Sequence, residues 1–296
     1  MGRPIPEIDP DALDGALVLG ALGREPGPVA VERVRRAVVR YAWATGAAIG
    51  KVYESDAAGR AGFEALRALW AGGFCERAPT GIRVPEPYAY LPVLRLLLME
   101  HVPGEPLKRL VRNGLAGGAE LDLLAEALAK LHRSPPASDR KIGLEEHLRE
   151  RCAALVPRLL VEFPELAAAV ARILERAREA EGSASMTVAH GDLHLGQVLV
   201  AGDRLWIVDL DALHIGDPAY DLAMVCMKLP DPGQRQRLLG SYAARGGDPN
   251  AAARVAVQTA LIHLKRACKR LRYQDEPGWA EQVLREVREG AKRLRA

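Results

Sequence analysis

The segment from His190 to Asp209 limits the possible fold more than any other part of the chain. It begins His-Gly-Asp, with a carboxylate at Asp192, and it places an amide five residues later at Gln197. Two apolar runs then flank a turn at 201–203, and the second run ends at the carboxylate of Asp209. Apolar and β-branched runs on either side of a glycine-containing turn predict a β-hairpin. We therefore expect a hairpin with an amide before its first strand and a carboxylate after its second.

The order of these polar side chains is the one that phosphoryl transfer to a hydroxyl requires. The attacking hydroxyl loses a proton, which a carboxylate such as Asp192 can accept. Gln197 and Asp209 then offer oxygen atoms to Mg²⁺, which bridges the nucleotide phosphates. The spacing matches the Asp-x-x-x-x-Asn sequence of kinases, with Gln197 in the Asn position. A polar-ended hairpin without catalytic function is the alternative, but Gly-Asp-Pro-Ala-Tyr-Asp at 216–221 favours the catalytic interpretation.

Composition narrows the class of protein. A chain of 296 residues is long enough for two lobes, and its net charge of +3 gives no evidence for a nucleic-acid partner. The four cysteines stand alone in the sequence, which is typical of a reducing cytosol rather than of a disulfide framework. Neither a signal peptide nor an apolar run of about 20 residues is evident. The sequence predicts a cytoplasmic protein with no membrane and no nucleic-acid partner.

Hydrophobic patterning predicts a bilobal α+β fold. Strand-like runs at 38–41 and 49–53, a helical pattern at 60–70 and an apolar run at 94–99 indicate a small β-rich lobe, residues 1–101. Pro103-Gly104 then indicates a linker. Helical patterns follow at 121–131, 144–156, 164–181 and from about 220 to the end. They indicate a larger, mostly helical lobe, residues 102–296.

Lys51 is the candidate for a lysine that pairs with nucleotide phosphates. It lies on the second predicted strand, and its expected partner is Glu64 on the following helix, with Glu54 as the alternative. Gly46 to Lys51 also resembles a P-loop, but it is one residue short and Val52 stands where Mg²⁺ binding needs Ser or Thr. No glycine-rich loop precedes Lys51, so the backbone of the turn at 40–46 is expected to cover the phosphates.

Three of these segments, 190–199, 208–211 and 216–223, resemble the aminoglycoside phosphotransferase family, which is similar to choline kinases and other small-molecule kinases. The resemblance runs from about residue 51 to 223 and includes an interlobe-like segment at 98–107. It implies a protein-kinase-like fold, ATP or GTP as donor, Mg²⁺ and a small hydroxyl acceptor.

The same resemblance implies roles for individual residues. Asp192 matches the catalytic base, and Gln197 and Asp209 match the metal ligands. The remaining matches are a structural carboxylate that braces the catalytic loop, Asp221, and nucleotide contacts in the interlobe segment, Glu100, His101 and Val102.

Gln197 departs from the family, which has Asn at this position. Gln offers the same amide oxygen on a longer stem, and the local sequence also resembles bacterial maltokinases, which carry Gln there. Two hypotheses therefore stay open: an active small-molecule kinase, and a nucleotide-binding pseudokinase with a regulatory or partner-binding role. A protein kinase is disfavoured because no Ala-Pro-Glu segment follows Asp209.

Charge in the last third of the chain bears on the acceptor. Residues 265–295 hold ten Lys or Arg against five Asp or Glu. A solvated helix face explains such a run, but a polycationic aminoglycoside would need an acidic pocket for charge complementarity. The pattern favours a sugar or another neutral or anionic acceptor over an antibiotic with several ammonium groups.

Asp192→Asn is expected to abolish turnover and to leave nucleotide binding nearly unchanged. A general base contributes roughly 10²–10⁴-fold to the rate and contacts the acceptor rather than the nucleotide. Acceptor-dependent ADP release and calorimetric titration with Mg-ATP measure the two effects, with Asp203→Asn in the predicted turn as the control. A variant with near-normal kcat would remove Asp192 from this role.

Overall fold

The computed structural model describes residues 8–25, 27–143, 146, 152, 154–182 and 184–294. The chain divides into two compact units that are interleaved in sequence. Unit 1 comprises Met1–Asn113 and Gly196–Asp211, and unit 2 comprises Gly114–Leu195 and Ala212–Ala296. The 3₁₀ turns η4 (Leu195–Gln197) and η5 (Leu210–Ala212) stand where the chain passes between the units. The predicted lobes 1–101 and 102–296 stay a prediction.

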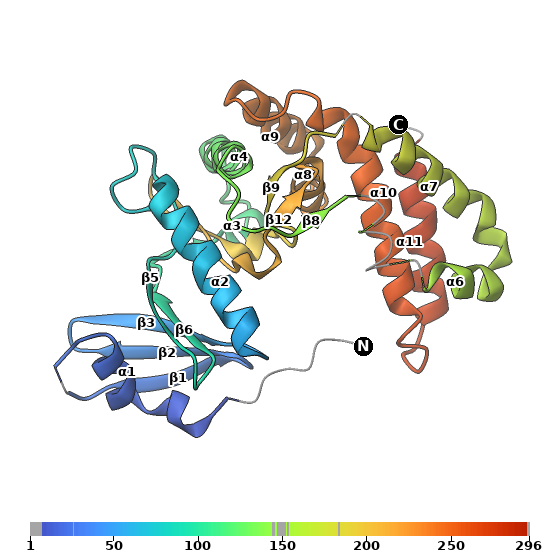
Figure 1. Ribbon diagram of the computed structural model, residues 1–296. Coiled ribbons are helices and arrows are strands. Elements are labelled where there is room, and N and C mark those ends of the chain that lie inside the picture. The colour runs from blue at the N-terminus through green and yellow to red at the C-terminus, as the bar shows by residue number, and fades with distance from the viewer. Residues whose placement is uncertain are drawn as a thin grey trace. The chain divides into compact units, whose positions relative to one another are not determined.

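Unit 1 is built on an antiparallel five-stranded sheet of order β1-β2-β3-β6-β5 (Figure 1). Its strands are β1 (Ala30–Arg35), β2 (Val38–Trp43), β3 (Gly46–Val52), β5 (Pro87–Leu91) and β6 (Leu96–Glu100). Its helical segments are η1 (Pro10–Leu13), α1 (Gly15–Ala21), α2 (Asp56–Leu69), η2 (Trp70–Phe74) and α3 (Leu107–Arg112). The predicted strands at 38–41 and 49–53 and the predicted helix at 60–70 are confirmed. Helix α1 and the mostly exposed strand β1 were not predicted.

The two faces of the sheet in unit 1 have different environments. Val39, Tyr41 and Val52 are buried in one cluster with Val18 of α1. Because side chains alternate along a strand, Lys51 belongs to the face opposite Val52. The position of Lys51 therefore follows from the burial of its neighbours.

Helix α2 packs against strand β5 of the same sheet. The side chain of Ser55 caps its first turn, since Oγ accepts the N–H of Ala58 at 3.2 Å. A Cβ atom at Gly59 would overlap the ring of Tyr90 on β5, so only glycine allows this close approach. The helix is thus fixed both at its start and along its packed face.

A second sheet in unit 1 includes the predicted hairpin. Its strand order is β4 (Ile82–Arg83), β11 (Arg204–Ile207), β10 (Val198–Ala201) and β7 (Glu105–Pro106). Strands β10 and β11 are antiparallel, with Ala201 opposite Arg204, which confirms the predicted turn. The hairpin therefore completes a sheet whose other two strands come from the first 106 residues of the chain.

Unit 2 is mostly helical and contains a three-stranded sheet of order β8-β12-β9. The strands are β8 (Lys141–Ile142), β9 (Thr187–Ala189) and β12 (His214–Gly216). The helices are α4 (Gly118–His132), α6 (Val156–Glu162), η3 (Pro164–Leu166), α7 (Ala167–Glu181), α8 (Ala219–Cys226), α9 (Pro232–Ala244), α10 (Ala251–Arg270) and α11 (Trp279–Arg293). Of the predicted helix at 144–156, most residues lie outside the described ones; the other helical predictions are confirmed.

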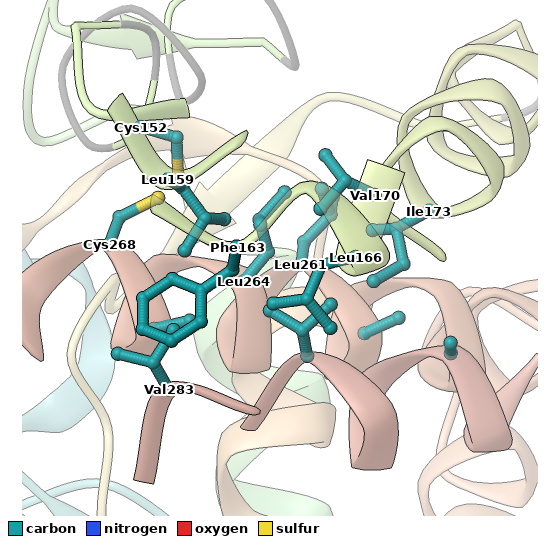
Figure 2. Close-up of a cluster of buried hydrophobic side chains, with 14 of the residues drawn as sticks. Cys152, Leu159, Phe163, Leu166, Val170, Ile173, Leu261, Leu264, Cys268 and Val283 are labelled. Carbon is teal, nitrogen blue, oxygen red and sulfur yellow. The ribbon is translucent and has the colours of Figure 1, made fainter. Parts of the chain in front are cut away.

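The main core of unit 2 forms where α6 and α7 pack on α10 and α11 (Figure 2). Leu159, Ile173 and Leu264 are completely buried there. The thiol of Cys268 contacts that of Cys152 at the edge of this core, and this contact together with burial raises the pKa of Cys268. Among the described residues, no helix has both the length and the apolar character of a membrane span.

Leu159→Ala is expected to destabilise unit 2 by about 2–5 kcal/mol, because it removes buried apolar atoms and leaves a cavity. Val161→Ala on the same helix is the matched control, since Val161 is 81% exposed and its truncation is expected to change stability by less than about 0.5 kcal/mol. Urea unfolding of both variants measures the difference. Equal effects would show that α6 does not pack as described.

Candidate active site

The hairpin β10–β11 brings Gln197 and Asp209 together. Gln197 directly precedes β10 and Asp209 follows β11 after one residue. The carbonyl oxygen of Gln197 accepts the N–H of Val208 at 3.0 Å, and its side-chain Nε2 donates to Oδ2 of Asp209 at 3.0 Å. Gln197 is buried, at 4% exposure, although an amide side chain usually lies at the surface. The buried side chain of Gln197 thus extends to the carboxylate of Asp209.

Asp209 has a strained backbone conformation. Its φ is +67°, in the left-handed region that non-glycine residues adopt at a cost of roughly 1–2 kcal/mol. Such conformations concentrate at functional sites because the surrounding structure must enforce them. Here the hydrogen bond from Gln197 holds the side chain of Asp209, while 43% of that side chain remains exposed.

Lys51 lies between two carboxylates of the same unit. Its Nζ is 2.5 Å from Oδ1 of Asp209 and 2.6 Å from Oδ2 of Asp211. Burial alone would lower the pKa of Lys51, but the negative charges of Asp211 and Asp209 outweigh it, so the pKa is raised. The lysine is thus a fixed positive charge at this site.

Tyr53 is a site residue that the sequence analysis missed. Its hydroxyl donates to Oδ1 of Asp211 at 2.8 Å, and burial together with the charge of Asp211 raises the pKa of the tyrosine. A signal was present, because Tyr53 stands two residues after Lys51 and so belongs to the same face of an extended chain. Asp211 is therefore part of the charged cluster.

The expected pair of Lys51 and Glu64 does not form. The carboxylate of Glu64 is 65% exposed and lies 3.5 Å from the guanidinium of Arg67, one turn along α2. The apolar stripe of α2 sets which face of the helix is buried, and Glu64 lies outside that face. The prediction of this ion pair was wrong because Asp209 and Asp211, far away in sequence, neutralise the lysine instead.

The turn between β2 and β3, which was expected to cover the phosphates, lies at the end of the ladder away from Lys51. In the β2–β3 ladder, Val38 is opposite Lys51 whereas Trp43 is opposite Gly46. The turn at 44–45 therefore stands five residues, or roughly 17 Å, along the strand from Lys51. The β1–β2 turn at Arg36 and Ala37 stands next to Val38 instead, at the Lys51 end of the ladder.

The interlobe-like residues follow the next strand of the sheet. Glu100 ends β6, and its Oε2 accepts the N–H of Glu86 at 3.1 Å. Burial raises the pKa of Glu100, and burial together with the charge of Arg40 lowers that of His101. Val102 follows in a segment without regular structure. Since Leu97 is opposite Lys51, Glu100 stands about 10 Å along β6 from the register position of the lysine.

Asp192 lies in unit 2, in a loop held by a buried carboxylate. Asp221 accepts the N–H of His190 at 2.6 Å and that of Gly191 at 3.0 Å. Gly191 has a φ of +81°, and a Cβ there would overlap the carbonyl of Ala212, so only glycine fits. The next residue, Asp192, is exposed to solvent. The loop thus has a fixed backbone and a free carboxylate.

Asp221 is fully buried and needs its donors. Nε2 of His132 lies 3.2 Å from Oδ2 of Asp221, and Nδ1 of the same ring lies 2.9 Å from the hydroxyl of Tyr242. Burial acts to raise the pKa of Asp221, but the hydrogen bond and charge of His132, with the contributions of His190, outweigh it, so the pKa is lowered. His132 and Tyr242 had no sequence signal that connected them to the loop.

The donor set in unit 1 fits Mg²⁺. Gln197, Asp209 and Asp211 supply amide and carboxylate oxygens, which a hard cation prefers. Among the described residues, no group of three or more His, Cys, Asp or Glu is arranged as a complete metal cage. Magnesium usually takes one or two carboxylates and completes its coordination with water and substrate phosphates. The residues present therefore suit a Mg²⁺ site that other oxygen ligands complete.

Asp221→Asn is expected to lower the free energy of unfolding by about 3 kcal/mol at pH 7, since three donors lose a charged acceptor. Because the pKa of Asp221 is lowered on folding, its contribution is complete above the unfolded-state pKa and is lost as the pH falls through the folded value. Urea unfolding between pH 7 and pH 3 should therefore show a smaller acid dependence in the variant.

Asp231→Asn is the control for this experiment. Asp231 is the exposed N-cap of α9, where Asn caps as well as Asp, so little change is expected. An Asp221→Asn variant as stable as this control would contradict the bracing role.

The chain is similar to several known proteins. The chain is 29% identical over 196 residues to methylthioribose kinase 1 of Oryza sativa subsp. japonica; the match covers 55% of this chain and 44% of that protein, so less than half of the relative's length is spanned. Among solved structures, a choline/ethanolamine kinase family protein from Mesorhizobium loti matches with a TM-score of 0.63 at 16% identity, covering 95% of this chain and 94% of its own.

A second solved structure, the GDP and kanamycin complex of APH(2")-IIia, matches with a TM-score of 0.66 at 15% identity and covers 92% of this chain and 96% of its own. These likenesses establish the expected α+β, protein-kinase-like fold. The sequence model of the phosphotransferase enzyme family matches residues 26–256. The chain therefore belongs to the phosphotransferase enzyme family.

Proposed function

We propose that this protein is a small-molecule kinase that moves the γ-phosphate of ATP to a hydroxyl group of a small acceptor, with GTP as the alternative donor. The observation that carries the proposal is the cluster in unit 1 that joins Lys51 to Gln197 and Asp209, although Lys51 is 158 residues away from Asp209 in sequence. A lysine, an amide and a carboxylate in contact are what binding of a magnesium nucleotide requires.

The nucleotide is held by unit 1 in this proposal. Lys51 leaves its contacts with Asp209 and Asp211 in part and pairs with phosphate oxygens, for which its raised pKa keeps it charged. Gln197 and Asp209 would hold Mg²⁺, with Asp211 beside them, and the ion would neutralise charge on the phosphates. The tight β1–β2 turn covers the phosphates, and Glu100, His101 and Val102 contact the base through the segment that follows β6.

The acceptor is activated by Asp192. Its exposed carboxylate accepts the proton of the attacking hydroxyl, and the loop that carries it is held in place by Asp221. The base needs no unusual environment for this role, because the proton leaves the hydroxyl as the bond to phosphorus forms. Precise placement of the loop is therefore the contribution of unit 2 to the chemistry.

A neutral or anionic sugar-like acceptor is the favoured class. The relative named methylthioribose kinase acts on a ribose derivative by its name. The C-terminal third of the chain is basic, and this charge disfavours binding of an aminoglycoside with several ammonium groups. We propose the cytoplasm as the site of action, because the spacing of the cysteines in the sequence is typical of a reducing compartment.

A nucleotide-binding pseudokinase is the second candidate, and Gln197 is the observation that favours it. In the structure its amide N–H faces the carboxylate of Asp209, so metal binding requires the amide to turn its oxygen toward the ion. A pseudokinase would bind the nucleotide and release no ADP with any acceptor.

A Gln197 series separates the two candidates. ADP release with Mg-ATP is measured across sugars, amino alcohols and aminoglycosides for the wild type, Gln197→Asn and Gln197→Ala. For an active kinase we expect the Asn variant to keep substantial activity and the Ala variant to lose roughly 100-fold and to need more Mg²⁺. A wild type that is inactive with every acceptor, combined with gain of activity in the Asn variant, would establish the pseudokinase. Equal activity and Mg²⁺ dependence in wild type and Ala variant would remove Gln197 from the metal site.

A further inference from the structure

Unit 2 contains a cavity of about 270 Å³ that lies against the catalytic loop. Helices α7 and α10 and strand β12 contribute its walls, and Gly191, the residue before Asp192, is one of its lining residues. Gly191 has no side chain to fill the space, and its φ of +81° prevents another residue from taking its place. A molecule in this cavity is therefore adjacent to the backbone that carries the proposed base.

The walls of the cavity are mainly apolar. Ala177 and Ala180 of α7 line it together with Val257 and Leu261 of α10, and Met186 adds a thioether. Met186 is 46% exposed, so this wall reaches the surface and gives a ligand a path of entry. The small alanine side chains leave room that an apolar group of a ligand can occupy. Its burial there is favourable by the hydrophobic effect.

The polar edge of the cavity is electrically balanced. Asp217 is the one charged side chain among the described lining residues. It accepts from the guanidinium of Arg254 at 2.9 Å, from the N–H of Ala219 at 3.0 Å and from Nε2 of Gln258 at 2.8 Å. Arg254 is itself only 3% exposed. A cationic ligand thus meets a carboxylate whose hydrogen-bonding capacity is already used.

Gln258 is the side chain that this arrangement offers to a ligand. Its Nε2 donates to Asp217, which fixes the orientation of the amide. The amide oxygen Oε1 and the second N–H remain for hydrogen bonds with a hydroxyl group. The cavity therefore combines apolar walls with a polar edge that includes this oriented amide, His214 and Tyr220.

We propose that this cavity binds the apolar substituent of a neutral acceptor, so that the substrate is a small hydroxyl compound of about one sugar ring that carries an alkyl or alkylthio group. The inference rests on the proposed function and refines its acceptor class. A volume of about 270 Å³ is at the lower end of ligand pockets, which suits a single ring and a short substituent. Polycationic, multi-ring acceptors are unsuited to both its size and its charge.

The test compares ribose with 5-methylthioribose and 5-propylthioribose as acceptors for ADP release with Mg-ATP. For the wild type we expect kcat/KM to be at least about tenfold higher for the substituted sugars, since one or two buried carbon groups give that much discrimination. Ala180→Leu fills the cavity and is expected to remove this preference.

Ala169→Leu is the matched control, because Ala169 is also half-buried on α7 and packs against the same core without lining the cavity. It is expected to keep the preference. Met186→Ala enlarges the cavity at an exposed position and is expected to shift the preference toward the propylthio sugar by several-fold. This variant tests the proposal even where Ala180→Leu does not fold.

The outcomes separate the two proposals. Turnover of ribose and its alkylthio derivatives with equal kcat/KM, unchanged in Ala180→Leu, would overturn the cavity assignment and leave the kinase intact. If no acceptor is turned over, the proposed function fails. Calorimetric titration with 5-methylthioribose then tests whether the cavity binds the substituted sugar. Binding that Ala180→Leu abolishes and Ala169→Leu keeps supports it, and no binding to the wild type overturns it.

Discussion

The burial of one carboxylate determines the shape of the catalytic loop. Asp221 is completely inaccessible to solvent, and a charged group in that position is very costly unless donors surround it. Two of those donors are consecutive backbone N–H groups, at His190 and Gly191, and they can converge on one carboxylate only because Gly191 is left-handed. The same constraint leaves Asp192 in solvent and Gly191 at the wall of a cavity. The hydrogen bonds that a single buried charge needs thus determine the position of Asp192, the proposed base, and that of Gly191 at the cavity wall.

Charge balance governs the other unit in a different way. The side chain of Lys51 is largely buried. The carboxylates of Asp209 and Asp211, which follow the second strand of the hairpin, balance its charge. One of them, Asp209, has a left-handed backbone, and the other is bonded to Tyr53. A cluster with two negative charges and one positive charge attracts a further cation, and the lysine can transfer its contacts to phosphates. Under the proposed function, a metal and a nucleotide would therefore replace interactions that already exist.

Sequence reasoning succeeded where spacing alone determines position. The hairpin places Gln197 and Asp209 together because four residue pairs of the ladder lie between its turn and its open end. The strand position of Lys51 follows likewise from alternation. The partners of Lys51 could not be obtained this way, since Glu64 was chosen from helix periodicity. The actual partners follow β11, a strand whose sheet forms between distant segments of the chain. His132 and Gln258 were equally out of reach, because each acquires its role from a tertiary contact with Asp221 or Asp217.

The interleaving of the two units has a consequence for how the protein is made. Strands β4 and β7 emerge from the ribosome within the first 106 residues, but their neighbours in the sheet, β11 and β10, are translated about a hundred residues later. At a synthesis rate of roughly 5–20 residues per second, both strands keep unpaired backbone edges for several seconds or longer. During that interval the nascent chain has the lysine of the nucleotide site without its carboxylates. Newly made chains thus expose unpaired strand edges until Ile207, the last residue of β11, has left the exit tunnel.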